Sequence, residues 1–438
     1  LIPLPAGEPR RLGITNANNS DMFPDGRIVF AEMGSSRTDW FVADKNGMNP
    51  RKVLSLPGAV GNVSVSPDGK IVMVQEQPGD RRLFEIAADG TGLREVRRLS
   101  EDEGNFRWTP DGKYLVYQSG SPPHSDIWLL PMRTGLFRRS EEAIRLTNGP
   151  VPYSYPCPSR DGKQIFALGT KQRGELVRYD MKLKQFVPFL GGISATDPTF
   201  SRDGKWVAYA SYPDHTIWRS RSDGSERLQL TFPPMDAIFP FISPDGTKVA
   251  FHTDKNEIYV VSMEGGTPQK INADNAFGAT WSPDGNYLLN TSASPPNQPR
   301  ITDAHTGKNS PVPGGSYKSF WLTQDIVAGP DEKLQKLVAF NLKTGQSTDL
   351  TPDVPDGIEH WMISPDSKYL YVTTGGADAK ALRVRIDGHQ LETITSLKDI
   401  HRVVNHGDTQ INVAPDGSPI FTRDTGYQEI YALNIKWP

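Results

Sequence analysis

Cysteine is nearly absent from this sequence, which has Cys157 alone among 438 residues. A disulfide within the chain is therefore excluded, and packing alone must hold the fold. No apolar run approaches the roughly 20 residues that a membrane-spanning helix needs, so no span is expected in this segment. The chain starts at Leu1 without a signal-peptide pattern, which favours a mature chain or a segment of a longer protein.

An excess of charge of one sign is also missing. Lys and Arg number 48 against 51 Asp and Glu, which gives a net charge of -3 and a pI near 6.3. A protein without a basic stripe lacks the electrostatic footprint of nucleic-acid binders. We therefore expect this segment to bind no nucleic acid.

Glycine and proline, in contrast, are abundant, with 40 and 37 residues. Together they make up about 18% of the chain, against about 12% in an average protein. They fall in turns rather than in a low-complexity run, which indicates many tight hairpins. The most regular of these turns reads Pro-Asp-Gly or Arg-Asp-Gly, with degenerate copies at two places. Its aspartates are Asp25, Asp68, Asp111, Asp161, Asp203, Asp245, Asp284, Asp325, Asp366 and Asp416.

The spacing of these aspartates reveals a repeat. Successive distances are 43, 43, 50, 42, 42, 39, 41, 41 and 50 residues, the period of a propeller blade. One complete copy, residues 196–232, predicts four short strands at 198–201, 205–210, 216–221 and 227–231. A sheet of this size cannot bury both faces alone, so copies must stack.

The turn itself has a physical cause, and its aspartate is predicted to be structural. Proline presets φ, aspartate bonds the local backbone, and glycine takes the left-handed conformation that closes the hairpin. Ser367, which replaces that glycine in one copy, is expected to cost about 1 kcal/mol of strain.

The strand before each turn alternates in character. Residues five and three before the aspartate are mostly apolar, as in Val63 and Val65, whereas the residue six before it is mostly polar. A period of two with one apolar side predicts a half-buried strand, here the innermost strand of a blade with its polar residues near the channel mouth. The candidate ligand-binding residues at that mouth are Asn19, Asn62, Asn105, Arg107, Tyr155, Asp197, His360 and Gln410. They could bind a sugar or a peptide terminus, or could be solvated strand ends that hold water.

The two ends of the chain complement each other. The last repeat stops after its predicted third strand, residues 430–433, and the N-terminal residues 8–12 look like an orphan fourth strand. Their pairing would close a ring and leave no exposed inner edge. The prediction is thus an all-β chain folded as a single closed β-propeller of ten four-stranded antiparallel blades over residues 1–438. An eight-bladed ring with two irregular repeats, or two rings, remain alternatives.

Two repeats carry insertions, at 121–149 with His124 and at 396–410 with His401 and His406. Long loops at the rim of a rigid ring are potential binding sites. Tolerated surface insertion is the other interpretation.

Catalytic and metal-binding motifs are missing from the sequence. No G-x-S-x-G occurs, and the eight histidines form no H-E-x-x-H or paired spacing. Residues 44–49 have a faint calcium-loop look but occupy a turn between the third and fourth strands. No catalytic residue, cofactor or metal ion is predicted.

The repeats resemble the WD-like repeats of the periplasmic propeller of the Tol system. Residues 203–235, 173–195 and 423–438 are similar to one large family that is abundant in Acidobacteria. Members often carry an N-terminal winged-helix DNA-binding domain, or a serine/threonine kinase domain, then a membrane span and this propeller. His215 stands where the family pattern has glycine. The resemblance implies an extracytoplasmic, periplasmic sensory or interaction module, and it supplies no catalytic residues.

Three functional hypotheses follow. The first is a non-enzymatic sensor that binds a protein, peptide or glycan and forms the sensory module of a membrane-anchored transcriptional regulator. The second is a propeller enzyme, a lyase or a glycan-acting hydrolase, that uses Asp197, His360 and Tyr155 around the channel. The third is a scaffold that binds a partner through its rim loops. A monomer is expected.

Overall fold

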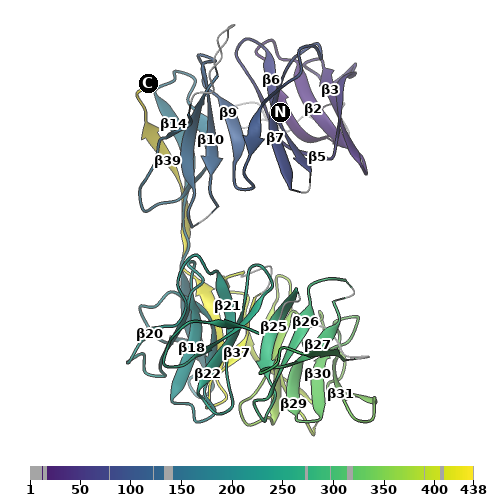
Figure 1. Ribbon diagram of the computed structural model, residues 1–438, viewed down its shortest axis with the longest axis vertical. Helices are drawn as coiled ribbons and strands as arrows, with labels where there is room; N and C mark the ends of the chain where they lie inside the picture. The colour runs from purple at the N-terminus through teal and green to yellow at the C-terminus, as the bar shows by residue number, and fades with distance from the viewer. Residues whose placement is uncertain are drawn as a thin grey trace. The chain divides into compact units, whose positions relative to one another are not determined.

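The computed structural model describes Leu12 and residues 17–77, 79–121, 123–132, 142–271, 275–295, 297–312, 319–388, 390–404 and 409–437. Every regular element within these ranges is a β-strand, and the strands form ten antiparallel sheets, as expected of an all-β chain. The sheets fall into two compact units (Figure 1). Unit 1 comprises Leu1–Lys171 and Tyr427–Pro438, and unit 2 comprises Gln172–Gly426. The predicted single ring of ten blades over residues 1–438 is therefore not confirmed.

Unit 1 contains four of the sheets, and the first strands of consecutive sheets, β1, β5, β9 and β13, contact one another in that order. The strands of the four sheets are β1 (Ala17–Met22), β2 (Ile28–Met33), β3 (Arg37–Ala43) and β4 (Arg51–Pro57); β5 (Ala59–Val65), β6 (Lys70–Gln77), β7 (Asp80–Ala87) and β8 (Arg94–Leu99); β9 (Gly104–Trp108), β10 (Tyr114–Ser119), β11 (Asp126–Pro131) and β12 (Ile144–Arg145); and β13 (Tyr153–Pro158), β14 (Gln164–Lys171) and β39 (Tyr427–Asn434).

Unit 2 contains the other six sheets, each of four strands. Five of them are β17 (Ala195–Phe200), β18 (Trp206–Ser211), β19 (Ile217–Arg221) and β20 (Leu228–Gln229); β21 (Ala237–Ile242), β22 (Lys248–Thr253), β23 (Ile258–Ser262) and β24 (Gln269–Lys270); β25 (Ala276–Trp281), β26 (Tyr287–Ser292), β27 (Pro299–Asp303) and β28 (Asn309–Pro311); β29 (Phe320–Thr323), β30 (Ile326–Pro330), β31 (Leu337–Asn341) and β32 (Ser347–Asp349); and β33 (His360–Ile363), β34 (Tyr369–Thr373), β35 (Lys380–Arg385) and β36 (Leu391–Ser396). The sixth combines β15 (Gly174–Asp180) and β16 (Gln185–Pro188) with β37 (Asn412–Val413) and β38 (Pro419–Asp424).

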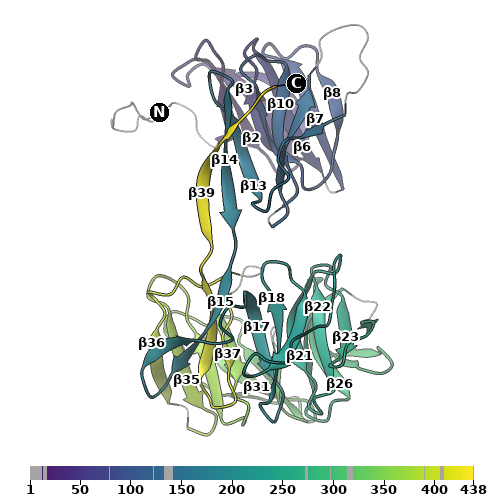
Figure 2. The same cartoon turned by 90° about the vertical axis from the view of Figure 1, so that its left-hand side faces the viewer.

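The innermost strands of unit 2 follow one another in a cycle. The strands β17, β21, β25, β29, β33 and β37 contact one another in this order, and β37 in turn contacts β17. Figure 2 shows β17, β21 and β37 side by side within unit 2. The sixth sheet completes the cycle because its strands come from both ends of unit 2. Unit 2 is thus a six-sheet propeller.

Two repeats differ from the sequence-based expectation. The repeats at Asp161 and Asp416 exchange strands, so that β14 pairs with β39 in unit 1 and β15 pairs with β38 in unit 2. The segment 430–433, predicted as the third strand of the last repeat, lies in β39 and instead completes the sheet of the Asp161 repeat. Gln172 and Arg173, the two residues between β14 and β15, are not the glycine or asparagine that a two-residue hairpin turn prefers. The predicted partner of β39, residues 8–12, lies almost entirely outside the described residues.

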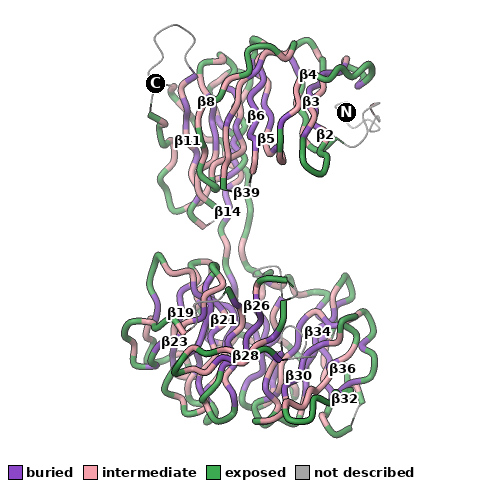
Figure 3. The backbone as a smooth tube through the Cα atoms, turned by 45° about the vertical axis from the view of Figure 1, so that its right-hand side comes forward, coloured by how far each residue is buried: buried purple, intermediate pink, exposed green. Residues whose placement is uncertain are grey.

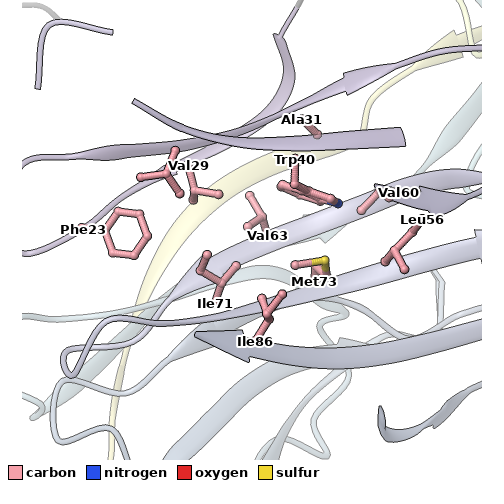
Figure 4. Close-up of a cluster of buried hydrophobic side chains, with 11 residues drawn as sticks. Phe23, Val29, Ala31, Trp40, Leu56, Val60, Val63, Ile71, Met73 and Ile86 are labelled. Carbon is pink, nitrogen blue, oxygen red and sulfur yellow. The ribbon is translucent and has the colours of Figure 1, made fainter. Parts of the chain in front are cut away.

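The cores lie between neighbouring sheets, where the apolar positions before each turn were predicted to pack. Val63, Phe106 and Trp361, each five residues before its turn aspartate, are buried. Figure 4 shows one such core, in which Trp40 of β3 lies over Val63 and Met73 of the next sheet. Along the chain, buried backbone coincides with the strands and exposed backbone with the turns (Figure 3). Stacking of half-buried sheets is therefore what holds each unit together.

The turn aspartates are structural, as predicted. In the Asp203 turn, Ser201 Oγ donates to Asp203 Oδ1 at 2.7 Å, and the same oxygen accepts the Lys205 N–H at 3.1 Å. These two bonds hold the pKa of Asp203 below its ordinary value. Gly204 has a φ of 70°, and Ser367, at the equivalent position of a later repeat, has a φ of 55°. Both residues adopt the left-handed conformation that closes the hairpin.

His215, which stands where the resemblance implied glycine, also has a left-handed backbone, with a φ of 47°. This conformation explains why glycine would be expected there, since glycine adopts it without strain. His215 Nδ1 lies 3.1 Å from an Asp236 carboxylate oxygen. The hairpin therefore keeps its shape, and the contact between His215 and Asp236 takes the place of the conformational freedom that glycine would have.

Candidate functional site

The candidate site is a cavity of about 400 Å³ at one end of the central channel of unit 2. All six innermost strands, or the residues directly before them, contribute to its wall. The cavity lies within the range of about 300–1,000 Å³ that is typical of small-molecule sites. A second cavity of about 560 Å³ lies at the end of the channel nearer the Pro-Asp-Gly turns.

One residue from each innermost strand lines both cavities and so marks the waist of the channel. This residue stands four positions before the turn aspartate, or five in the degenerate repeat at Asp325. The six waist residues are Thr199, Phe241, Thr280, Phe320, Met362 and Asn412. Phe241 and Phe320 meet edge-on, with ring centroids 6.0 Å apart. The waist is thus partly aromatic, and apolar side chains form much of the boundary between the two cavities.

The structure brings three of the eight predicted mouth residues together. Asp197 on β17, His360 on β33 and Gln410 just before β37 all line the 400 Å³ cavity. The other five lie on the first strands of the unit 1 sheets, so they belong to a different body. They are Asn19, Asn62, Asn105, Arg107 and Tyr155. These five residues therefore belong to unit 1 and the other three to unit 2, and ligand binding by any of the eight stays a prediction.

In unit 1, four of the predicted residues bond to neighbouring backbone or side chains. Asn19 Nδ2 donates to Val60 O at 2.9 Å, and Arg107 Nη1 donates to Val63 O at 2.8 Å. Both bonds join adjacent first strands. Asn105 Nδ2 donates to Gln118 Oε1 at 2.9 Å, and Asn62 Nδ2 makes a long 3.5 Å contact with Val63 O. These side chains have a structural use that a sequence pattern cannot separate from ligand binding.

Backbone geometry supplies a second reason for polar residues six positions before the turn aspartate. Five residues at this position have a positive φ and lie in or beside a β-bulge of the innermost strand. They are Asn105, Tyr155, Asp197, Phe239 and Gly278. Asparagine, aspartate and glycine tolerate this conformation better than other residues do. A polar residue six positions before the turn aspartate thus indicates the left-handed bulge as well as a position near the channel.

Asp197 and His360 are both buried and both tied to the protein. Thr196 Oγ1 donates to Asp197 Oδ2 at 2.9 Å. His360 Nδ1 accepts a long backbone hydrogen bond of 3.4 Å from the Ile411 N–H. The polar side of the mouth is therefore held in place without a ligand.

Arg402 fixes the two segments that carry His360 and Gln410. Its Nη1 donates to Glu359 Oε2 at 3.0 Å and to Thr409 Oγ1 at 2.8 Å. Glu359 precedes His360 in the chain, and Thr409 precedes Gln410. The guanidinium group thus clamps neighbouring blades beside the cavity, which preorganises its polar wall.

An aromatic group forms the opposite wall. The rings of Phe239 and His252 stack with centroids 5.1 Å apart and planes 12° apart. Phe277 lies 6.4 Å from the His252 ring, and His252 Nδ1 accepts the Gly278 N–H at 3.2 Å. Phe239 holds a φ of 51°, an unusual conformation for an aromatic residue. Such strain persists where the surroundings over-determine it, and it concentrates at functional sites.

Sequence reasoning missed most of this wall. His252 follows Val249, Ala250 and Phe251, and Asn290 follows Leu288 and Leu289. A polar residue that interrupts an apolar strand is the signal that was available for both. Both residues lie on second strands, whereas the predicted mouth residues come from the first strand of each blade.

The stretch with a faint calcium-loop look is a turn, and partner binding by the two rim loops stays a prediction. Asp44, in the stretch with a faint calcium-loop look, accepts the backbone N–H groups of Asn46 and Met48 at 2.9 Å each, as a turn residue does. Among the residues that the structure describes, no group of three His, Cys, Asp or Glu side chains is placed to hold a metal ion. His401 is exposed beside the clamp residue Arg402, and His406 lies outside the described residues. Within the described ranges, no helix is long and apolar enough to cross a membrane.

Comparison with known proteins finds partial matches. No family model matches the chain. The chain is 29% identical over 201 residues to the "Uncharacterized peptidase YuxL" of Bacillus subtilis, an alignment that covers 41% of this chain and 29% of that protein. It is 27% identical over 183 residues to "Uncharacterized protein Atu1656" of Agrobacterium fabrum, covering 37% of this chain and 59% of that protein. The alignments thus span less than two thirds of either relative.

Two solved structures are similar in fold. "The structure of putative TolB from Agrobacterium tumefaciens" has a TM-score of 0.48 at 16% identity, covering 58% of this chain and 99% of that one. "Crystal structure of Nidogen/Laminin Complex" has a TM-score of 0.41 at 12% identity, covering 52% and 92%. Both scores lie below 0.5, so the propeller assignment rests on the cyclic order of the sheets described above.

Proposed function

We propose that this chain is a non-enzymatic binding module and that its ligand enters the mouth cavity of unit 2. The observation that carries the proposal is that all six sheets of unit 2 contribute to one cavity of about 400 Å³. Asp197 and His360 on one side and the ring of Phe239 on the other offer polar and apolar contacts at once. Sites of this composition, mostly apolar with a few fixed polar groups, are typical of ligand binding.

The resemblance to the Tol-type and acidobacterial propellers extends this proposal to a biological role. In that role the chain is the extracytoplasmic sensory module of a membrane-anchored transcriptional regulator. Its ligand is a peptide, a glycan or an envelope protein, and binding is the signal that the rest of such a regulator would receive.

The proposal is tested by binding measurements on the full 438-residue chain. Isothermal titration calorimetry with peptides, glycans and purified envelope proteins should find a ligand. The Asp197→Asn and His360→Gln variants should weaken its binding, because both side chains line the cavity. The matched control is Asn105→Gly in unit 1, which changes the same repeat position and keeps the left-handed backbone accessible. A ligand that binds wild type and both cavity variants equally well would place the site elsewhere.

A second candidate function is an enzyme at the same cavity, a lyase or a glycan-acting hydrolase. The observation that favours it is that Asp197 and His360 line one cavity. Tyr155, the third residue of that hypothesis, lies on β13 of unit 1 and is not among the residues that line this cavity. Turnover of peptide or glycan substrates that His360→Ala abolishes would support this candidate, and turnover unchanged in that variant would end it.

A further inference from the structure

The second cavity of unit 2, at the turn end of the channel, is surrounded by an apolar ring. The residue three positions before each turn aspartate lines this cavity of about 560 Å³ on every innermost strand of unit 2. The ring residues are Phe200, Ile242, Trp281, Leu322, Ile363 and Val413. Val413 is buried, but the other five are partly exposed, so a molecule in the cavity can contact them.

The waist of the channel continues this apolar surface inward. Phe241, Phe320 and Met362 also line the cavity and are also partly exposed. The ring of Trp281 is held in place, because its Nε1 donates to Phe241 O at 2.9 Å. A contiguous apolar surface that remains in contact with water is uncommon on soluble proteins and marks a binding site.

A single charged side chain borders the ring. Arg202 is exposed, and it is the one ionisable residue among the described residues that line the cavity. Within the described part of the chain, its guanidinium group forms no ion pair. The neighbouring carboxylate of Asp203 is engaged elsewhere, since its Oδ2 lies 3.4 Å from Lys205 Nζ. The guanidinium group is therefore free to bind an anion that enters the cavity.

The position of Arg202 in the repeat sets it apart from its neighbours in unit 2. The residue directly before the turn aspartate is a proline in four of the other five repeats and Gln324 in the fifth; the prolines are Pro244, Pro283, Pro365 and Pro415. Proline favours the turn because it presets φ. The Asp203 repeat thus has a cation beside the cavity in place of a residue that stabilises the turn.

An apolar ring with one cation at its border is complementary to a molecule that has an apolar chain and one negative charge. A guanidinium group binds a carboxylate through two parallel hydrogen bonds, and an apolar chain gains free energy by leaving water for the ring. We infer that the turn end of the unit 2 channel binds a small amphiphilic carboxylate, a medium-chain fatty acid, with its carboxylate on Arg202 and its chain on the ring. This site is separate from the mouth cavity and goes beyond the proposed function.

The test is calorimetric titration of the full chain with octanoate, decanoate and dodecanoate at neutral pH and low ionic strength. Each added methylene group should tighten binding about fourfold until the cavity is filled. Decanol has the same chain as decanoate without the charge, so it should bind about tenfold more weakly. Decanoate affinity that is independent of chain length, or equal to that of decanol, would overturn the inference.

A first variant tests the contact with the carboxylate. Arg202→Gln should weaken decanoate binding about tenfold and leave decanol binding unchanged, because decanol has no charge to lose. The matched control is Arg160→Gln, since Arg160 is exposed and occupies the same repeat position in unit 1. If decanoate binds equally well to wild type and Arg202→Gln, the carboxylate does not lie on Arg202 and the inference is wrong.

A second variant tests the contact with the chain. Leu322→Gln should weaken decanoate and decanol alike, by at least about fivefold, because the ring loses apolar surface. Met22→Gln is its control, as Met22 stands at the same repeat position in unit 1 and is 43% exposed. Thermal denaturation shows whether each variant is folded. A folded Leu322→Gln variant that binds both molecules as tightly as wild type would exclude this cavity as the site.

Discussion

Thr199 and Thr280 occupy the same position of their repeats, four residues before the turn aspartate, but their hydroxyls differ. Thr199 Oγ1 donates to Pro240 O on the next innermost strand at 2.9 Å. Thr280 Oγ1 is buried at the waist of the same channel and has no partner among the described residues. The Thr199 hydroxyl therefore joins two blades. The Thr280 hydroxyl contributes no more to the fold than a methyl group in its place would.

Valine substitutions should separate these two roles. Thr199→Val loses a hydrogen bond and leaves Pro240 O unbonded, so it should lower the free energy of unfolding by about 1 kcal/mol. Thr280→Val removes an unsatisfied hydroxyl at constant shape and should be neutral or slightly stabilising. Urea denaturation of the two variants beside wild type measures the difference. Equal destabilisation by both would show that the Thr280 hydroxyl does have a structural partner.

The serine before each turn should control part of the acid stability. The pKa of Asp203 is lowered first by the Ser201 hydroxyl and then by the Lys205 N–H. A carboxylate whose pKa is lower in the folded state than in the unfolded state stabilises the protein at pH values above the unfolded-state pKa, 3.8. That contribution disappears as the pH falls through the folded-state pKa. Ser201→Ala should therefore be less stable than wild type at pH 7, and the difference should narrow below about pH 4.

Denaturant unfolding at neutral and acid pH measures this narrowing. Asp203→Asn provides the control, because it removes the titrating group and should flatten the same pH dependence. If the difference in the free energy of unfolding between Ser201→Ala and wild type stays constant across the pH range, the serine has another role.

The left-handed position of the turn predicts opposite effects of two substitutions. Ser367 has a φ of 55°, so Ser367→Gly should relieve strain and stabilise unit 2 by up to about 1 kcal/mol. Gly204 has a φ of 70°, and an added Cβ would lie 2.9 Å from Pro415 Cγ. Gly204→Ala should therefore destabilise unit 2 by more than about 1 kcal/mol. Thermal denaturation tests both, and a destabilising Ser367→Gly would contradict the strain argument.

The outer edge of β39 should be paired by the N-terminal segment. Ile430 of β39 is 79% exposed, and β14 is its partner strand within the described residues. Residues 8–12 carry the pattern of a fourth strand. If they pair there, hydrogen exchange of the β39 amides that face away from β14 should be slow in the wild-type chain. The exchange should become faster in Arg10→Pro, because proline has no backbone N–H to donate to the neighbouring strand.

Arg10→Ala is the control for this exchange experiment. It removes the same charged side chain but retains the backbone N–H, so it should preserve the protection of the β39 amides. Fast exchange of those amides in the wild-type chain would show that residues 8–12 do not pair with this edge.

Much of the fold could be predicted because the repeat is local. The turn at Asp203-Gly204 and the alternation that buries Val63 are each determined within a few residues. The strands predicted for the Asp203 repeat at 198–201, 205–210, 216–221 and 227–231 accordingly overlap β17, β18, β19 and β20. The exchange of β14 and β15 between units was not predictable. An alternating strand reveals which of its faces is buried, but it does not identify the strand that pairs with its edge.

The candidate site, like the fold, could be predicted from the sequence only in part. Asp197, His360 and Gln410 were found because they lie on or beside first strands, where the repeat has a fixed register. Asn290 and His252 come from second strands, and their meaning depends on which sheets form the ring. Tyr155 had the same local pattern as Asp197, and only the division into two units separates them.

The strand exchange makes unit 2 an insert within a hairpin of unit 1. Lys171 and Tyr427, where the chain leaves unit 1 and returns to it, are direct partners at the ends of β14 and β39. Within unit 2, the Thr425 N–H donates to Arg173 O at 2.9 Å, so the ends of that unit are also adjacent. A genetic deletion of residues 172–426 could therefore be sealed by a short turn, and the excised piece could be made as a separate gene product. During synthesis on the ribosome, the sheet of β13 and β14 must wait for its third strand until the whole insert has been translated.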